Sequence, residues 1–511
     1  MSHRKIYRER QEIPGQELYE EKGSSTSRSL LSSITWNYIC SLVSVLLTLA
    51  YTAFTGRTVD SGDYGSYAIA LTATQFFSHV ACAGLYSHLL RVECVTQQLL
   101  GAARRIALVS GIVCFLVTYA AAPLCAMLWK IPSVEPTLRL LALQFLFHPA
   151  ATVTNATLRR IGQAKRAAGN ELLGLAVGLS GGTLLILDGW NPWGLAAVPP
   201  ITSAAMLIFG TTTLAHSRRR PPIGPHVRVL NLLRESGGLS VHNLVDFATS
   251  NSPLWCVARL LGPTAAGCYS RAWLFASIPR ALLTQGINFT TTPAMADAQK
   301  MGCAPPVQVV HAILFGASAV AFVPFGAMAG MGPPLLELLL GPGWGSAVAL
   351  VPVLAVGSAL SLICSVGSSV DQVRRASRSM AVTKIAVIGG SSVAVAAAAA
   401  THSLTVFAAA AVTGPLLGHI AQLLSWRRDG VVHLRALLRA HMTHAAIGTA
   451  LFVSARLVTV GHRPVESLLY GFTATVAITL GCYPLRRRLP LYAIVKRCGL
   501  LGDRTKSALS P

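Results

Sequence analysis

The chain has 511 residues, of which 52% are hydrophobic and 12% are charged. Soluble proteins carry about 25% charged residues, so this composition excludes a set of soluble domains and indicates an integral membrane protein. The formal net charge is +23, but the basic residues form short clusters between apolar runs, which signals membrane topology rather than nucleic-acid binding. The 11 cysteines include no CxxC pair, which disfavours a metal site or a disulfide framework.

Taken in chain order, the apolar runs predict fourteen membrane-spanning helices of about 20 residues each. A polar tail precedes them and shows no pattern for signal-peptide cleavage. The sequence therefore predicts an all-α polytopic membrane protein, with its least distinct boundary in the 380–425 region. The predicted spans cover residues 30–55, 66–90, 106–129, 138–156, 170–188, 194–215, 236–260, 269–295, 307–330, 346–368, 380–400, 403–425, 441–460 and 466–484.

The spacing of these spans predicts two lobes of six helices followed by two further helices. If both termini are cytoplasmic, the inside segments hold 33 of the 42 Lys and Arg residues, as the positive-inside rule requires. The predicted parts are an N-terminal tail (1–29), an N-lobe (30–216), a basic linker (217–235), a C-lobe (236–425), a basic loop (426–440), two spans (441–484) and a basic C-terminal tail (485–511).

The two predicted lobes share an internal repeat. Each carries the spacing Arg-x7-Gly-x-Tyr, with a further glycine seventeen residues after the tyrosine. A repeat unit of six spans enters the membrane in the same orientation twice, which predicts a pseudo-twofold axis along the membrane normal and a ligand site between the lobes. The alternative is two unrelated bundles with ordinary loop glycines. The matched residues are Arg57, Gly65, Tyr67 and Gly84 in the first copy and Arg259, Gly267, Tyr269 and Gly286 in the second.

Ionisable residues within the spans are candidates for the binding site, because charge in hydrocarbon is costly. Cations outnumber anions there, and a positive cavity suits a phosphate-bearing substrate. Asp246, at mid-span depth, is the candidate for coupling to a cation, H⁺ or Na⁺. Snorkelling is the alternative for the arginines near the outer head groups, and it is the interpretation of Lys384 at the inner surface. The candidate substrate-binding residues are Arg57, Arg259, Arg271 and Arg280.

The sequence lacks the GxxxxGK[ST] nucleotide loop and a DxD pair, so neither ATP coupling nor use of nucleotide sugars is predicted. No catalytic residue, metal ligand or cofactor is expected, and the chain is interpreted as a transporter rather than an enzyme.

Several segments resemble the oligosaccharide-flippase (Wzx-type) branch of the multidrug/oligosaccharidyl-lipid/polysaccharide (MOP) exporter superfamily. They are the RTVDSGDYGSY run, the GCYSRA run that contains Tyr269 and Arg271, and the GPGWG run that contains Trp344. The likeness covers residues 30 to about 430, and the Ala/Val-rich end of the second half departs from it.

The resemblance implies two six-helix lobes around a cationic cavity that opens alternately to each side. The implied substrate is an undecaprenyl-pyrophosphate-linked oligosaccharide, carried from the cytoplasmic to the outer leaflet of the bacterial cytoplasmic (inner) membrane. The implied role is export of a surface glycan such as an exopolysaccharide or O-antigen. Implied partners are the lipid bilayer, a polysaccharide polymerase and the export machinery; nucleic acid is not among them.

Three alternatives stay open at the level of the sequence. Two are transporters, namely a peptidoglycan lipid-precursor flippase and a cation-coupled multidrug exporter. The third is a membrane glycosyltransferase or polymerase, for which Asp60 and Asp63 in the first outer loop would be the acidic pair. Short outer loops and a plain turn explanation for the Asp-Tyr-Gly run argue against this third alternative.

Overall fold

The computed structural model describes residues 16–81, 84–92, 95–217, 222, 247–300, 307–374, 376–459 and 463–482. These residues are almost entirely helical, and no strand occurs among them. The first half contains α1 (Gln16–Thr58), α2 (Ser61–Ala81), α3 (Leu85–Arg91), α4 (Gln97–Trp129), α5 (Val134–Ala142), the 3₁₀ helix η1 (Leu143–Leu146), α6 (His148–Arg160), α7 (Ala164–Leu187) and α8 (Trp193–Ala215).

The second half begins with a helical segment at residues 247–261. It continues with α10 (Pro263–Lys300), α11 (Val307–Leu340), α12 (Gly345–Val373), α13 (Ser377–Thr401), α14 (Leu404–Arg428), α15 (Leu434–Thr459) and α16 (Pro464–Cys482).

The described part of each of the fourteen predicted spans coincides with one or more of these helices, so the predicted all-α polytopic fold is confirmed. Residues 236–246 of the seventh span lie outside the described residues, as do residues 1–15, most of the predicted 217–235 linker and the predicted 485–511 tail. By length and composition alone, eight helices within the described residues could cross a membrane. Two predicted spans are interrupted helices. Span 66–90 breaks between α2 and α3 at Gly84, whose φ is +69°, and span 138–156 consists of α5, η1 and α6. The matched Gly286 instead lies inside the uninterrupted α10.

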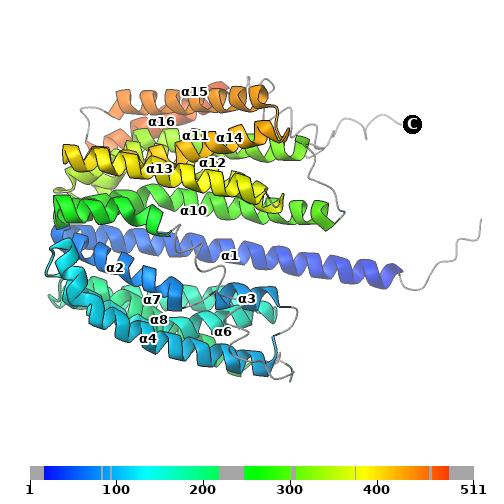
Figure 1. The fold of residues 1–511 in the computed structure, drawn as a ribbon, viewed down its shortest axis with the longest axis vertical. Helices are drawn as coiled ribbons and strands as arrows, with labels where there is room; N and C mark the ends of the chain where they lie inside the picture. The colour runs from blue at the N-terminus through cyan, green and yellow to red at the C-terminus, as the bar shows by residue number, and fades with distance from the viewer. Residues whose placement is uncertain are drawn as a thin grey trace, which may run out of the picture.

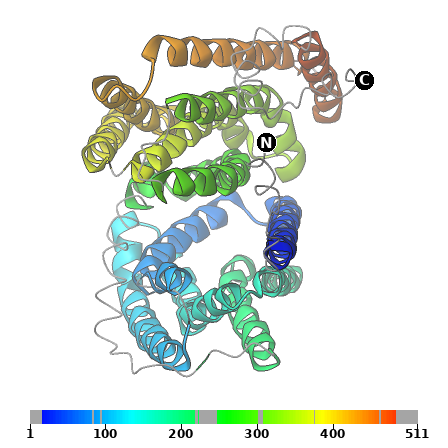
Figure 2. The same ribbon diagram turned by 90° about the vertical axis from the view of Figure 1, so that its right-hand side faces the viewer.

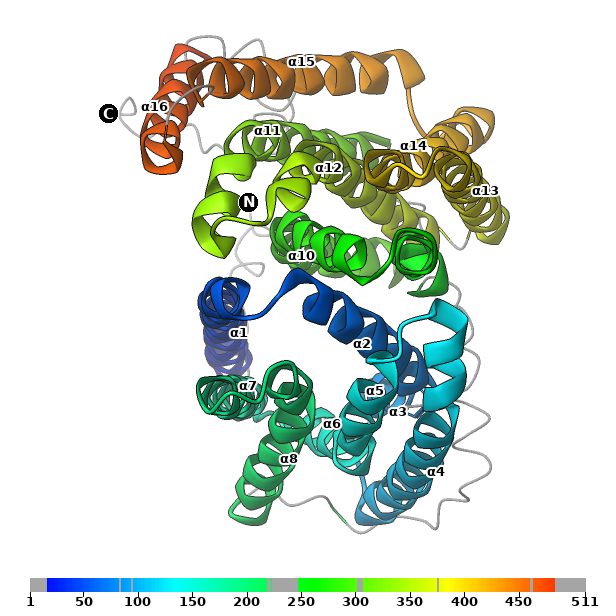
Figure 3. The same ribbon diagram turned by 90° about the vertical axis from the view of Figure 1, so that its left-hand side faces the viewer.

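The helices form two lobes and an additional layer (Figure 1). Helices α1–α8 make the first lobe, and residues 247–261 with α10–α14 make the second. Helices α15 and α16 pack against α11 on the side away from the first lobe (Figure 1, Figure 2 and Figure 3). We call the end of the bundle where α1 begins the tail side and the opposite end the far side. Helix α1 has 43 residues, about 65 Å of helix, and extends beyond its neighbours on the tail side (Figure 1).

Glycines allow the helix pairs within each lobe to approach closely. Gly174, Gly178 and Gly182 recur at every fourth position of α7, and a Cβ added to any of them would lie within 2.4 Å of an atom of α8. In the second lobe, a Cβ on Gly414 of α14 would lie 2.2 Å from the hydroxyl oxygen of Ser391 on α13. Small residues at such spacing are the usual basis of helix association in membranes, where apolar burial gives little driving force.

The two lobes meet through the repeat glycines themselves. A Cβ on Gly65 of α2 would lie 1.8 Å from the carbonyl oxygen of Pro263, and one on Gly267 of α10 would lie 2.0 Å from that of Ser61. The same sequence offset separates Ser61 from Pro263 and Gly65 from Gly267. The two contacts are therefore exchanged by the axis that relates the lobes, which is the reciprocity a twofold contact requires.

Candidate functional site

The far side of the bundle is closed by contacts between the lobes. The indole N–H of Trp344 donates to the carbonyl oxygen of Gly56 on α1 at 2.9 Å. The Trp344 ring also packs edge-on against Tyr64 of α2, with centroids 5.5 Å apart. The exposed Arg57 donates from its guanidinium to the carbonyl oxygen of Leu338 on α11 at 2.7 Å. Arg57 and Trp344 therefore join α1 to the second lobe at its far-side end.

Arg271 lies at the same interface, one turn of α10 after Gly267. Its guanidinium carbon is 4.4 Å from the centroid of the Tyr64 ring, within the range of a cation–π contact. Its buried Nε atom has no hydrogen-bond partner among the described residues. Tyr269 is 3% exposed and stacks on Trp273, while the partly buried Tyr67 packs against the same core. The repeat tyrosines, Tyr67 and Tyr269, thus belong to an aromatic interface that also contains the guanidinium of Arg271.

A polar cavity of about 430 Å³ lies inside the second lobe, among residues 247–261, α10, α12, α13 and α14. Two cationic side chains, Arg280 of α10 and Lys384 of α13, reach it, and none of its described lining residues is acidic. The lining residues are Thr249, Ser250, Trp273, Arg280, Ser361, Cys364, Ser365, Ser368, Ser369, Gln372, Met380, Lys384, Val387, Ile388 and Pro415.

One face of α12 supplies most of the hydroxyl groups in this cavity, because its serines recur at helical spacing. The Ser365 and Ser369 hydroxyls donate to the carbonyl oxygens of Leu362 and Ser365 in the same helix. Their oxygens keep acceptor capacity. The cavity therefore combines acceptors suited to sugar hydroxyls with cations suited to an anion.

The four candidate arginines do not form one cluster. Arg271 and Arg280 are nine residues apart on α10, which is two and a half turns and places them on opposite faces of the helix. Arg259 is exposed at the end of the 247–261 segment and does not line the polar cavity. Asp246, the candidate for cation coupling, lies outside the described residues. Among the candidates that the structure describes, Arg280 alone lines the polar cavity.

An apolar pocket of about 410 Å³ lies on another face of α10, between α1, α11 and α16. Helix α10 contributes Phe275, Ile278 and Pro279. Because Pro279 directly precedes Arg280, one turn of α10 contacts both the apolar pocket and the polar cavity. The other lining residues are Leu49, Pro324, Phe325, Ala327, Met328, Met331, Gly332, Leu335 and Leu468.

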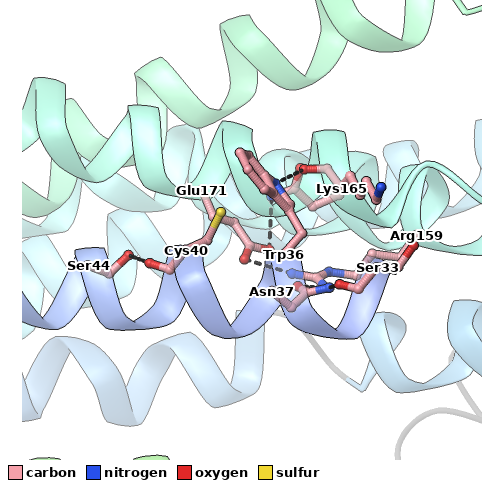
Figure 4. A network of polar contacts seen from close by, with 9 residues as sticks. Ser33, Trp36, Asn37, Cys40, Ser44, Arg159, Lys165 and Glu171 are labelled. Carbon is pink, nitrogen blue, oxygen red and sulfur yellow. Dashed lines mark hydrogen bonds and ion pairs between the residues drawn. The ribbon is translucent and has the colours of Figure 1, made fainter. Parts of the chain in front are cut away.

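Each lobe also has an arginine at its tail side that pairs with a carboxylate. Arg159 donates to Glu171 of α7 at 2.8 Å and to Asn37 of α1 at 3.0 Å; Figure 4 shows its guanidinium between these two partners. In the second lobe, Arg374 pairs with the fully buried Asp371 at 3.4 Å. Arg159 and Arg374 are thus each compensated by a carboxylate of their own lobe.

Sequence reasoning missed several of these residues. Lys384, interpreted as a snorkelling cation, lines the polar cavity with Arg280. Glu171 and Asp371 were not recognised as ion-pair partners. One sequence signal does point to this cavity. Polar residues recur at helical spacing on the otherwise apolar span 346–368 and just after it, which indicates a polar helix face; they are Ser361, Ser365, Ser368, Ser369 and Gln372.

The comparisons with known proteins agree with this architecture. The sequence profile of the family described as "Polysaccharide biosynthesis protein" matches residues 56–349. The succinoglycan biosynthesis transport protein ExoT of Rhizobium meliloti (strain 1021) is 26% identical over 355 residues, which cover 66% of this chain and 68% of that protein.

Two solved structures share the fold. The lipid II flippase MurJ in an inward closed conformation superposes with a TM-score of 0.67 at 10% identity, covering 88% of this chain and 98% of MurJ. An inward-facing multidrug resistance MATE family transporter of the MOP superfamily gives 0.61 at 14% identity, covering 79% and 99% of the two chains. Because the family profile covers more than half of the sequence, this chain belongs to the polysaccharide biosynthesis protein family, with the fold of the MOP-superfamily transporters.

Proposed function

We propose that this protein is a flippase that moves an undecaprenyl-pyrophosphate-linked oligosaccharide from the cytoplasmic to the outer leaflet for export of a surface polysaccharide. One observation carries the proposal. A single turn of α10 separates a polar cavity that contains Arg280 and Lys384 from a pocket lined by apolar side chains. This arrangement matches an amphiphile with an anionic, sugar-bearing head and a hydrocarbon tail.

The polar cavity addresses the main energetic difficulty of such a substrate. A pyrophosphate loses its hydration when it leaves water, and an uncompensated charge in a low-dielectric region is costly. The two cations that line this cavity, Arg280 and Lys384, offset this cost, and the arginine fork offers bidentate contacts to phosphate oxygens. The serine oxygens of α12 would accept hydrogen bonds from the first sugars.

The apolar pocket suits the lipid part. It lies between α1 of the first lobe and α10, α11 and α16 of the second half of the chain, so an isoprenoid chain in it would contact both lobes.

The closed far side assigns a step in the proposed transport cycle. The distribution of basic residues makes the tail side cytoplasmic, so a protein closed on the far side would receive its substrate from the cytoplasm. The related ExoT is named as a transport protein of succinoglycan biosynthesis.

Two alternatives fit the described residues less well. A multidrug exporter for cations needs acidic groups in its cavity, whereas the charged side chains among the described lining residues of this one are Arg280 and Lys384. The carboxylate of Asp60, a candidate for a glycosyltransferase site, accepts a hydrogen bond from the backbone N–H of Gly62 at 2.8 Å. That contact explains Asp60 as a turn residue. Coupling to H⁺ or Na⁺ through Asp246 remains part of the proposal.

The test is the lipid-linked glycan pool of a strain that lacks the protein, measured by mass spectrometry together with the surface polysaccharide. We expect accumulation of a completed lipid-linked oligosaccharide and loss of the surface glycan. Complementation with Arg280→Gln/Lys384→Gln should fail although the variant reaches the membrane, because the anionic head would enter the cavity uncompensated. The matched control is Arg259→Gln, which removes an exposed arginine from the same lobe and should restore export.

Three outcomes would contradict the proposal. Full export by the double variant would mean that the polar cavity is not part of the transport path. Unextended lipid-linked sugars in the deletion strain would indicate a glycosyltransferase or polymerase instead. An unchanged lipid pool with altered drug sensitivity would indicate a multidrug exporter.

A further inference from the structure

A second polar hollow lies on the first lobe, at the tail side of α1, α7 and α8. These helices run along one edge of the lobe (Figure 3). The hollow has a volume of about 820 Å³, and we call it the tail-side groove. It is distinct in position from the polar cavity, which belongs to the second lobe. Its lining residues are Trp36, Lys165, Arg166, Gly169, Asn170, Thr212, Thr213 and His216.

The groove faces outward from the bundle rather than into the lobe. On α7, Glu171 points to Arg159 and Asn155 of α6 inside the lobe, whereas Lys165, Gly169 and Asn170 line the groove on the other side. Leu173 and Val177 continue the same face of α7 at helical spacing and are 53% and 43% exposed. Large apolar side chains exposed along a spanning helix contact lipid, so the groove opens to the bilayer.

The chemistry of the groove is that of an anion site. Lys165 and Arg166 are exposed cations, and no described residue of the lining is acidic. Lys165 donates one hydrogen bond to Ser32 at 2.6 Å, which leaves two of the three ammonium donors for another acceptor.

Asn170 provides an independent observation. Its side-chain oxygen accepts a hydrogen bond from the Thr213 hydroxyl at 3.3 Å, which sets the orientation of the amide. Its Nδ2 group therefore faces away from that contact, and it is buried without a hydrogen-bond partner among the described residues, in a residue that is 6% exposed. A buried N–H donor of this kind requires an acceptor. Asn170 lines the groove, so a phosphate oxygen that displaces the side-chain atoms covering Nδ2 would supply one.

The depth of the groove matches the head-group region of the tail-side leaflet. The Trp36 ring is 43% exposed and its N–H donates to the carbonyl oxygen of Lys165 at 3.1 Å, as Figure 4 shows. Tryptophan and basic residues are the usual anchors at this level. Toward the bilayer centre, Leu173 and Val177 of α7 and Ile208 of α8 form an exposed apolar strip that begins one turn from the groove.

We propose that the tail-side groove binds the head group of an anionic glycerophospholipid, with its phosphate at Lys165, Arg166 and Asn170 and its acyl chains along the apolar strip. Phosphate contacts from two cations and an amide give the site its charge selectivity. The strip adds apolar contact that a soluble phosphate ion cannot use. This site is independent of the transport proposal and would exist whichever substrate the protein carries.

The experiment is native mass spectrometry of the purified protein in detergent, titrated with dioleoyl-phosphatidylglycerol or dioleoyl-phosphatidylcholine. We expect phosphatidylglycerol to bind at least about tenfold more tightly, because both lipids carry a phosphate but the choline group adds a cation that would lie close to Lys165 and Arg166. Lys165→Gln/Arg166→Gln should weaken that binding about tenfold or more, and Asn170→Ala by a smaller factor. The matched control is Arg104→Gln/Arg105→Gln, which removes two exposed arginines of α4 in the same lobe and should leave the affinity within about twofold.

Several outcomes would overturn the assignment. Equal affinity for the two phospholipids would exclude charge selectivity. An equal loss of affinity in the control variant would mean that general surface charge, rather than the groove, attracts phosphatidylglycerol. Displacement of phosphatidylglycerol by millimolar inorganic phosphate would identify a site for a soluble anion. Tighter binding of undecaprenyl phosphate than of phosphatidylglycerol would make the groove a site for the carrier lipid.

Discussion

The reciprocal glycine contact between the lobes makes a quantitative prediction about the closed far side. An alanine at Gly65 would place its Cβ 1.8 Å from the carbonyl oxygen of Pro263, and one at Gly267 would place it 2.0 Å from that of Ser61. Ordinary contacts begin at about 3.4 Å, and the opposing atoms are backbone atoms that cannot rotate away. Helices α2 and α10 must therefore separate by more than an ångström in either variant.

We expect each substitution to disfavour the closed far side by about 2 kcal/mol, the middle of the range for overpacking, which is about a 30-fold change in a two-state equilibrium. Because the pseudo-twofold axis exchanges the two contacts, Gly65→Ala and Gly267→Ala should have similar effects. Neither contact lies within a lobe, so the helical content of each variant should stay unchanged.

Cross-linking across the interface measures this effect. A Cβ on Gly62 of α2 would lie 3.7 Å from the hydroxyl oxygen of Thr264 on α10, so cysteines at both positions should form a disulfide when the far side is closed. In a background without the native cysteines, Gly65→Ala or Gly267→Ala should lower the cross-linked fraction strongly. The control is Gly345→Ala, also on the far side, where an added Cβ meets nothing within 4 Å. Cross-linking equal to this control in both variants would refute the close-contact argument.

Two further predictions concern stability, measured as the midpoint of thermal unfolding in detergent. Gly178→Ala places a Cβ 1.9 Å from the Thr202 hydroxyl oxygen and 2.9 Å from the Val198 carbonyl oxygen, so we expect the free energy of unfolding to fall by about 1–3 kcal/mol. The control is Gly169→Ala on the same helix, where an added Cβ has nothing within 4 Å and should be neutral or stabilising. Equal effects of the two substitutions would contradict the packing argument. Asp371→Asn should lower the free energy of unfolding by about 3 kcal/mol. The fully buried Asp371 carboxylate accepts hydrogen bonds from Trp426 and Ser379, each at 2.7 Å, and it also compensates the charge of Arg374. Asp429→Asn, whose carboxylate is 43% exposed, should cost less than about 1 kcal/mol; a larger loss there than at Asp371 would reverse the assignment.

The resemblance and the repeat together anticipated the arrangement of the lobes. Gly65 and Gly267 were matched by spacing alone, and they meet at the lobe interface as exchanged partners. The match failed to predict local geometry at Gly84 and Gly286, since one breaks a helix and the other lies within one. Spacing along the chain identifies equivalent positions, but neighbours decide whether a glycine serves as a break or as part of a continuous helix.

The sequence by itself determined the membrane class, the positions of the apolar spans and the repeat of six spans. These properties follow from local composition, because about 20 apolar residues in hydrocarbon must form a helix to satisfy their own backbone groups. Only the tertiary structure decided which charges share a site. Arg271 and Arg280 are close in sequence but lie on opposite faces of α10, whereas Arg280 and Lys384 are more than a hundred residues apart and line one cavity. A binding site depends on helix rotation and lobe packing, which are set by contacts between distant residues such as Gly65 and Pro263.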